Sequence, residues 1–396
     1  MFSAVLCGCA KRAPQLTIEQ LQAVSGAYTA SDSPDLPSSV YGVDGKLVYE
    51  NERTVPTPLT PVSATEFTSG DGKTRVHYVF TPDGDGRAAS LTVTRPDNHK
   101  TVMQRSGGPQ RHSFPAYVRS EAMIAMRDGV RLHAVILKPA GVTQALPFVM
   151  QRTPYGVDGT TMESLYEYRP ELARALYIFV DEDIRGRFKS EGEFVMSRPM
   201  ADHHDAKVID ESTDAYDTVA WLLKNVAGNN GRVGVVGTSY PGFLSMAAGI
   251  DPHPAVKAIS PQAPMIDVWM GDDFFHNGAF RQTYGYDYAL GLESSKEMTE
   301  VQYKGPDGKA VDGFDYFLSR GSFAEDVKQS GAHTPAGEVL PTWKLFLDEP
   351  QYGPFWSSRG VEHHLDTVAV PTLSVGGYYD QEDMWGAGRI CGVRAT

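Results

Sequence analysis

The chain has 396 residues, 41% of them hydrophobic and 10% aromatic, so it can bury a large core and is not expected to be disordered. Its 36 basic and 49 acidic residues give a formal charge of -13, which argues against nucleic acid and anionic membranes as partners. No apolar run approaches the roughly 20 residues that span a bilayer. Cys7, Cys9 and Cys391 are the three cysteines, and they predict neither a disulfide framework nor a metal site; no cofactor is expected.

The start of the chain has two interpretations. Residues 1–10 resemble the end of a bacterial lipoprotein signal in which Cys9 is acylated, although the apolar part is short for an export signal. This interpretation predicts a periplasmic or extracellular location. It also predicts that the longer parent protein is anchored to a membrane through the lipid on Cys9. The alternative is a disordered start over residues 1–15, which leaves a cytoplasmic location open.

The next part, residues 16–110, is expected to be a small antiparallel β accessory domain. The clearest strands are residues 46–49, 76–80 and 90–94, and Asp44-Gly45 is a turn signal between two of them. Nothing in this part pairs a nucleophile with a base. A packing or substrate-presenting role is therefore expected for it.

Residues 111–396 alternate between strands and helical stretches, which predicts a mostly parallel sheet. A hairpin is expected around Asp128-Gly129, and an amphipathic helix is expected over residues 214–224. Buried strands are expected at residues 147–150, 175–180, 232–236, 257–260 and 372–375. The long stretch between the last two, residues 266–366, has little strand periodicity and is expected to form a helical cap over the site.

Ser239 is the candidate nucleophile. It follows the β-branched strand at 232–236, lies between Gly237 and Gly242, and precedes a helical stretch at 243–250. A serine on a tight turn between strand and helix is how a hydrolase exposes its nucleophile at the edge of a sheet. The spacing G-x-S-x-x-G departs by one residue from the usual motif, so a helix-capping serine remains the alternative.

Asp380 is the candidate orienting acid, because it follows the strand at 372–375 and a carboxylate there would hold an imidazole in its productive tautomer. Its alternative role is a helix N-cap.

Several runs together resemble the X-prolyl dipeptidyl peptidase and cocaine esterase-type serine hydrolases, and within them the α-amino acid ester hydrolases and glutaryl acylases most closely. The runs are RTPY at 152–155, DIRGRFKSEG at 183–192, DAYD at 214–217, GTSYPG at 237–242, DPHP at 251–254, SPQAP at 260–264 and YDQED at 379–383. The resemblance covers about residues 118–390. It implies an α/β-hydrolase fold with a helical cap, and the family's C-terminal jelly-roll domain is absent from this sequence.

The resemblance also assigns roles to residues. Ser239 becomes the nucleophile and Asp380 the orienting acid, while the Tyr240 amide and the Tyr155 phenol would form the oxyanion hole. Asp273, Glu382 and Asp383 resemble the carboxylate cluster that holds a substrate ammonium group. Without the resemblance, Tyr155 would be taken for a core tyrosine and the acids for a solvated face.

The base is the missing part. All 11 histidines precede Asp380, whereas the family places its histidine after the acid. His276 and the pair His363-His364 lie in plausible regions, but in the wrong order. After residue 387 the sequence departs from the family pattern, as a frameshift would cause. We therefore expect a truncated member with impaired activity.

The sequence is compatible with three functions. The first is a serine hydrolase or acyltransferase that acts through an acyl-enzyme on α-amino acid esters or related β-lactam amides. The second is an X-Pro dipeptidyl peptidase, and the third is a non-catalytic amine-binding remnant. The expected partner is a small ester, amide or short peptide, with a possible homo-oligomer in the intact parent.

Overall fold

The computed structural model describes residues 13–201, 203, 205, 207–269, 274–276, 278–305, 307–322, 325 and 340–377. The chain divides into two compact units. The first combines residues 1–116 with 161–175, and the second combines 117–160 with 176–396. Within the described ranges, every helix is too short or too polar to cross a membrane.

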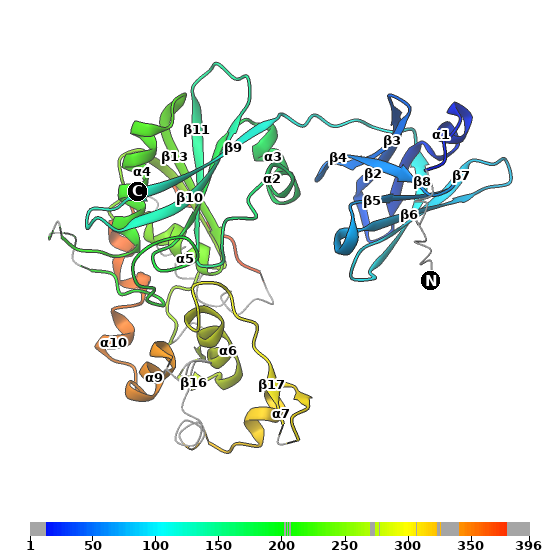
Figure 1. Cartoon of the computed structure of the whole chain (residues 1–396). Coiled ribbons are helices and arrows are strands. Elements are labelled where there is room, and N and C mark those ends of the chain that lie inside the picture. The colour runs from blue at the N-terminus through cyan, green and yellow to red at the C-terminus, as the bar shows by residue number, and fades with distance from the viewer. Residues whose placement is uncertain are drawn as a thin grey trace, which may run out of the picture. The chain divides into compact units, whose positions relative to one another are not determined.

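The first unit is a closed barrel of eight antiparallel strands, drawn in blue to cyan in Figure 1. Each strand pairs with the next along the chain, and the last pairs with the first. The turn at Asp44-Gly45 has positive φ at both residues, as a tight hairpin turn requires. The strands are β1 (Gly26–Ala30), β2 (Ser33–Val43), β3 (Lys46–Asn51), β4 (Thr54–Pro61), β5 (Glu66–Ser69), β6 (Val76–Pro82), β7 (Ala88–Thr94) and β8 (Lys100–Gly107). The strands expected at 46–49, 76–80 and 90–94 are β3, β6 and β7.

Three α-helices belong to this unit. Helix α1 (Ile18–Val24) precedes the barrel, and Arg105 of β8 donates hydrogen bonds to the carbonyls of Ala23 and Ser25 at its end. Helices α2 (Met162–Tyr168) and α3 (Pro170–Arg174) come from the later segment. The Tyr166 hydroxyl of α2 donates to the Pro115 carbonyl at 2.9 Å, which ties the segment to the end of the first one.

The second unit contains a six-stranded sheet in the order β14-β13-β11-β12-β10-β9. The hairpin around Asp128-Gly129 is formed by β9 (Tyr117–Ala125) and β10 (Arg131–Pro139). The parallel strands are β11 (Leu146–Thr153), β12 (Ile178–Asp183), β13 (Asn229–Thr238) and β14 (Val256–Gln262). Their Val, Ile and Phe side chains are buried, as expected for strands covered on both faces. The predicted strand at 372–375 appears as two isolated parallel bridges to β14, at Thr372 and Val375.

Two helices of this unit pack against the sheet, each lying in the chain between two consecutive parallel strands. Helix α4 (Glu211–Asn225) begins at Asp210, whose carboxylate accepts the N–H of Thr213 at 2.8 Å and so caps the helix. It contains the expected helix at 214–224, and buries Ala215, Val219 and Leu222 along one face. Helix α5 (Tyr240–Ala247) follows β13 after a single residue.

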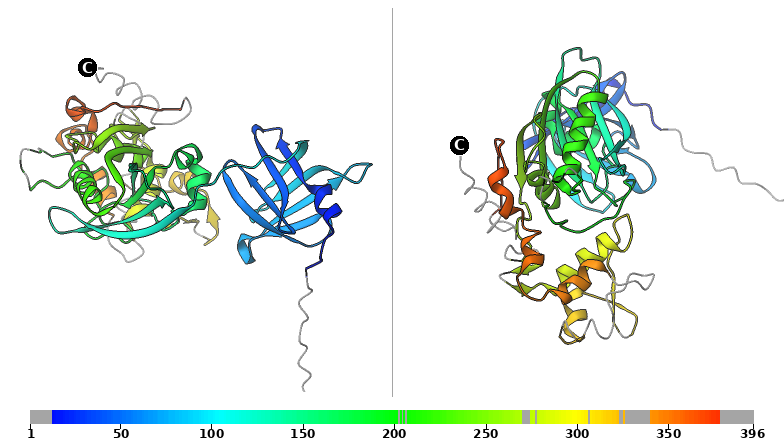
Figure 2. Two further views of the ribbon diagram at one scale, coloured as in Figure 1. Left: turned by 90° about the horizontal axis from the view of Figure 1, so that it is seen from above. Right: turned by 90° about the vertical axis from the view of Figure 1, so that its left-hand side faces the viewer.

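Residues 266–366 form short helices and two small hairpins. Figures 1 and 2 show most of these helices together at one end of the sheet, whereas η2 (Val361–Thr367) lies beside helix α5. The helices are α6 (Gln282–Glu293), α7 (Gly313–Leu318), α9 (Pro341–Asp348), α10 (Pro354–Ser357) and the 3-10 helix η2 (Val361–Thr367). The hairpins pair β15 (Phe275–His276) with β16 (Ala279–Phe280) and β17 (Tyr303–Lys304) with β18 (Ala310–Val311).

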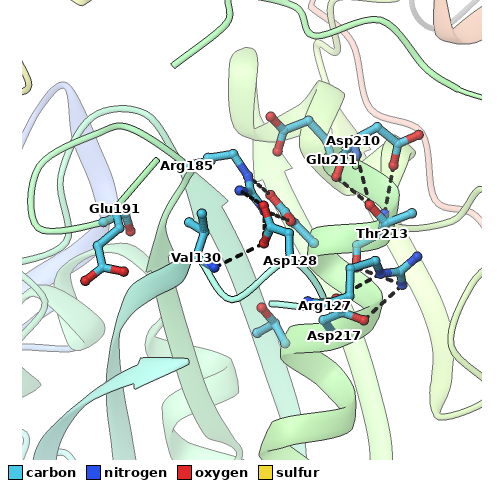
Figure 3. Close-up of polar contacts among 12 residues, drawn as sticks. Arg127, Asp128, Val130, Arg185, Glu191, Asp210, Glu211, Thr213 and Asp217 are labelled. Atoms are coloured by element: carbon cyan, nitrogen blue, oxygen red, sulfur yellow. Dashed lines mark hydrogen bonds and ion pairs between the residues drawn. The ribbon is translucent and has the colours of Figure 1, made fainter. Parts of the chain in front are cut away.

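Buried ion pairs hold α4 against the sheet. The Arg185 guanidinium bonds Asp214 of α4 at 2.7 and 3.0 Å, and it bonds Asp128 of the hairpin turn at 2.7 Å. Figure 3 shows Arg185 beside Asp128, and below them Arg127 paired with Asp217 of α4. Because Asp214 is only 1% exposed, its carboxylate depends on Arg185 and its neighbours for compensation.

We predict that Arg185→Met lowers the free energy of unfolding of the second unit by about 3–5 kcal/mol, since it leaves buried carboxylate charge uncompensated. Urea unfolding followed by tryptophan fluorescence measures this, because all five tryptophans lie in the second unit. Arg131→Met is the matched control: Arg131 pairs with Glu191 on the surface, and its loss should leave the midpoint unchanged. Equal shifts in the two variants would contradict the assignment.

Candidate active site

Ser239 occupies a strained turn between β13 and α5. Its φ of 64° and ψ of -124° lie where residues other than glycine are rarely found. Its N–H donates to the Gln262 carbonyl of β14 at 2.9 Å, and its carbonyl accepts the N–H of Phe243 at 3.0 Å. The turn is thus bonded to the neighbouring strand and to the helix it starts, which fixes the serine at the edge of the sheet.

Gly237 and Gly242 allow this turn to form. A Cβ on Gly237 would lie 2.1 Å from the Pro241 carbonyl oxygen, and one on Gly242 would lie 2.4 Å from the Gln262 carbonyl oxygen. Neither backbone oxygen can move without opening the turn. The glycines that flank Ser239 in sequence are therefore required by the close approach of strand and helix.

The strand register brings Tyr155 and Tyr240 to the same level. Strands β11 and β13 run parallel with Met150 opposite Val235. Both strands end three residues later, at Thr153 and Thr238, so the two tyrosines each lie two residues beyond a strand end. Adjacent parallel strands deliver their carboxyl-end residues to one edge of the sheet.

Tyr240 is fully buried, and its hydroxyl accepts the N–H of Ser197 at 2.9 Å. Burial raises the pKa of its phenol. Its backbone N–H lies in the first turn of α5, where N–H groups have no acceptor within the helix. The side chain therefore anchors the helix, and the amide is the part of Tyr240 suited to a ligand.

Tyr155 is 37% exposed and lines a cavity of about 310 Å³. Thr238 and Pro241, on either side of the Ser239-Tyr240 pair, line the same cavity. The remaining lining residues are Gln151, Thr153, Gly156, Val157, Thr160 and Asp181. The structure thus places Tyr155 and the serine turn around one space.

Tyr288, whose hydroxyl oxygen lies 2.6 Å from that of Tyr155, was not identified from sequence motifs. It belongs to α6, 133 residues further along the chain. No motif marks it, apart from the aromatic content of the segment.

Asp380, Glu382, Asp383 and Asp273 lie outside the described residues, as does the side chain of His276. His363 lies 3.3 Å from the Tyr352 hydroxyl. The pKa of His364 is lowered by burial and by the neighbouring histidines His363 and His203.

Over the described part of the chain, one group has the spacing of metal ligands: Glu121, His133 and Asp158. The Lys189 ammonium lies 2.6 Å from Asp158 and 3.4 Å from Glu121. This amine already supplies the positive charge that the two carboxylates need. The group is therefore explained as an ion-pair cluster.

Comparison with known proteins places these features in a family. The pattern of the family described as X-Pro dipeptidyl-peptidase (S15 family) matches residues 128–391. Cocaine esterase from Rhodococcus sp. (strain MB1 Bresler) is 28% identical over 274 residues, which is 66% of this chain and 44% of the esterase.

Two solved structures are similar at 36% identity and a TM-score of 0.63. One is an α-amino acid ester hydrolase, with 72% of this chain and 47% of that chain covered. The other is an aminopeptidase from a marine sediment archaeon (Thaumarchaeota archaeon), with 73% and 48% covered. The chain thus spans about half the length of each relative, and its second unit has the fold of the α/β hydrolases.

We predict that Gly237→Ala slows the reaction of Ser239 with a fluorophosphonate by roughly a hundredfold, because a shift of about 1 Å at a reacting group can cost that much. The added methyl would overlap the Pro241 carbonyl. Gly353→Ala is the control, since Gly353 is extended and nothing lies within 4 Å of its Cβ position. Mass spectrometry of the labelled protein measures both rates, and an unchanged rate in Gly237→Ala would contradict the geometry.

Proposed function

Because the chain belongs to the X-Pro dipeptidyl-peptidase (S15) family, we propose that it derives from a serine hydrolase whose nucleophile is Ser239. The observation that carries the proposal is the turn itself: a serine at φ 64° between a parallel strand and a helix, closed by two glycines that cannot be replaced. A helix-capping serine needs no such strain.

In the proposed reaction, Ser239 Oγ attacks the carbonyl carbon of an ester or amide, and a base accepts the hydroxyl proton. The carbonyl oxygen becomes an oxyanion, for which the Tyr240 N–H and the Tyr155 hydroxyl are the proposed donors. Collapse of the intermediate expels the leaving group and leaves an acyl-enzyme, which water or another acceptor then cleaves. Donors fixed in advance stabilise the developing charge without reorganisation.

The proposed acyl donor carries an ammonium group. Asp380 is the proposed orienting acid, and Asp273, Glu382 and Asp383 are proposed to hold the amine. Several carboxylates beside one nucleophile are tolerated when a cation offsets their repulsion. The 36% identity to an α-amino acid ester hydrolase supports this choice. The aminopeptidase of equal similarity and the family description favour dipeptide release from X-Pro substrates as the second candidate.

We also propose that residues 266–366 act as the cap over this site. The support is that α6 reaches the strand-end loop: its Tyr288 meets the hydroxyl of Tyr155. A cap that contacts an oxyanion donor would both shape the acyl pocket and exclude water from it.

These 396 residues alone should hydrolyse esters slowly. The proposed reason is that all 11 histidines precede Asp380, out of the family's order, and a serine without an aligned base is a poor nucleophile at neutral pH. Purified protein assayed with a chromogenic α-amino ester should therefore show only slow turnover. Turnover at about 1–10³ s⁻¹, the usual range for enzymes, that is lost in Ser239→Ala would contradict this.

We predict that a fluorophosphonate labels Ser239, slowly but selectively, and that Ser239→Ala abolishes the labelling. A strained, preorganised site still offers oxyanion donors to the phosphonate, whereas a non-catalytic amine-binding pocket does not. Ser245 is a matched internal control, because its buried hydroxyl donates to the Val235 carbonyl at 3.0 Å. Labelling spread over several serines would sink the proposal.

The same assay identifies the substrate class by competition. An α-amino ester should slow the labelling of Ser239, and its N-acetyl derivative, which lacks the positive charge, should not. Protection by an X-Pro dipeptide anilide instead would favour the dipeptidyl peptidase. Equal protection by the charged and acetylated esters would argue against the carboxylate cluster.

A further inference from the structure

The phenol of Tyr155 has one proton, and the oxyanion hole proposed above requires it. The Tyr155 hydroxyl lies 2.6 Å from that of Tyr288, a hydrogen bond in which either oxygen could donate. When the Tyr155 hydroxyl donates its hydrogen bond to an oxyanion, it has no second proton to donate. Its oxygen can then only accept a hydrogen bond from Tyr288. The chemistry of the oxyanion state therefore fixes the direction of this hydrogen bond: Tyr288 donates and Tyr155 accepts.

Tyr288 is well suited to be the donor. Its ring stacks on Tyr284 of the same helix, with centroids 5.7 Å apart, and lies 5.7 Å from Phe274. Burial raises the pKa of its phenol well above the usual value, and the neighbouring Tyr155 adds to this. The phenol is thus held in one orientation and stays protonated.

The Arg187 side chain connects the loop of Tyr155 to the helix of Tyr288 by binding backbone carbonyls of both. Its Nε donates to the Pro154 carbonyl at 3.0 Å, directly before Tyr155, and its Nη1 donates to the Ser295 carbonyl at 2.6 Å. The same Nη1 also donates to the Leu292 carbonyl in the last turn of α6. One fully buried guanidinium therefore joins the Tyr155 loop to the helix of Tyr288.

The electrostatics of this connection are favourable. Arg187 is compensated mainly by backbone carbonyls, including the C-terminal end of α6, where the helix dipole places partial negative charge. Burial lowers the pKa of this guanidinium, yet an arginine remains charged throughout the working range. Because the planar guanidinium donates to three backbone carbonyls, it fixes the spacing between the Tyr155 loop and helix α6.

We infer that Tyr288 is a positioning residue of the oxyanion hole: it donates to the Tyr155 oxygen, directs the Tyr155 proton toward the oxyanion, and is held there by Arg187. This inference rests on the proposed function, because it assumes that Tyr155 serves Ser239. A hydrogen bond donated to a phenol oxygen polarises its O–H and strengthens the next bond in the chain. Tyr288 itself does not touch the substrate.

The effect can be measured without a catalytic base. Serine hydrolases stripped of their triad keep a residual acceleration of about 10³–10⁴ from the oxyanion hole and binding. The slow phosphonylation of Ser239 in this chain therefore reports on the oxyanion donors themselves. Varying the fluorophosphonate concentration separates the maximal labelling rate of Ser239 from the affinity for the probe.

The experiment is a double-mutant cycle on the purified chain. Tyr155→Phe should lower the maximal labelling rate by about a hundredfold, the usual cost of one oxyanion donor. Tyr288→Phe should lower it by roughly three- to tenfold, with probe affinity unchanged, since it removes only polarisation and positioning. In the Tyr155→Phe background, Tyr288→Phe should have no further effect, because Tyr288 acts through Tyr155.

Tyr286→Phe is the matched control. It lies on the same helix but packs against Trp343 and Phe317, and its variant should label at the parent rate. Thermal unfolding of each variant separates a lost fold from a lost donor. A purely structural role for Tyr288 would lower the rate equally with and without the Tyr155 hydroxyl.

The outcomes distinguish the two proposals. If Tyr155→Phe lowers the rate and Tyr288→Phe does not, or if their effects are additive, the role of Tyr288 is overturned while the proposed function stands. If Ser239 is not labelled, or if Tyr155→Phe has no effect, the oxyanion assignment fails and the role of Tyr288 fails with it.

Discussion

The close approach of strand β13 and helix α5 is the constraint on which the site depends. The chain reverses within one residue, and it can do so only because two glycines leave room for carbonyl oxygens and Ser239 accepts a left-handed backbone. The hydrogen bond from Ser239 to Gln262 then fixes the turn to β14. Since β11 lies on the other side of β13 in matched register, the Tyr155 loop ends at the same edge. Ser239, the N-terminus of α5 and the Tyr155 phenol come together as a result of sheet geometry.

Three buried arginines fix the elements around that edge: carboxylates compensate two of them, and backbone carbonyls mainly compensate the third. Arg152 bonds Glu182 and Glu211 at 2.7 and 3.0 Å, and Arg185 bonds Asp128 and Asp214. Arg187 is held mainly by carbonyls. Desolvation cancels much of the attraction in such pairs, so their value lies less in net stability than in excluding other arrangements. In this chain they set the positions of α4, the β9–β10 turn and α6 relative to the strand ends.

Local patterns explain which parts of this fold the sequence could predict. The strands that became β3, β6, β7 and β11 to β14, the helix within α4 and the serine turn all follow from residue periodicity and glycine placement. Pairings between distant segments have no such signal. The closure of β1 on β8, the inclusion of residues 161–175 in the first unit and the meeting of Tyr155 with Tyr288 each join segments far apart in the chain. The acid was inferred from its place after the strand at 372–375 and the carboxylate cluster from resemblance, and both lie outside the described residues.

In the proposed site, the described residues supply the groups that would stabilise negative charge, and the proposed acid lies outside the described residues. This arrangement has a physical consequence. A phenol can donate only while it is protonated, and burial keeps the pKa of Tyr288 high, so Tyr288 can still donate to Tyr155 as pH rises. The amide of Tyr240 does not titrate in this range. If no histidine is aligned with Ser239, as proposed, its hydroxyl becomes a better nucleophile as the hydroxide concentration rises. The site should therefore gain reactivity with pH until its phenols ionise, rather than follow the titration of a histidine near neutrality.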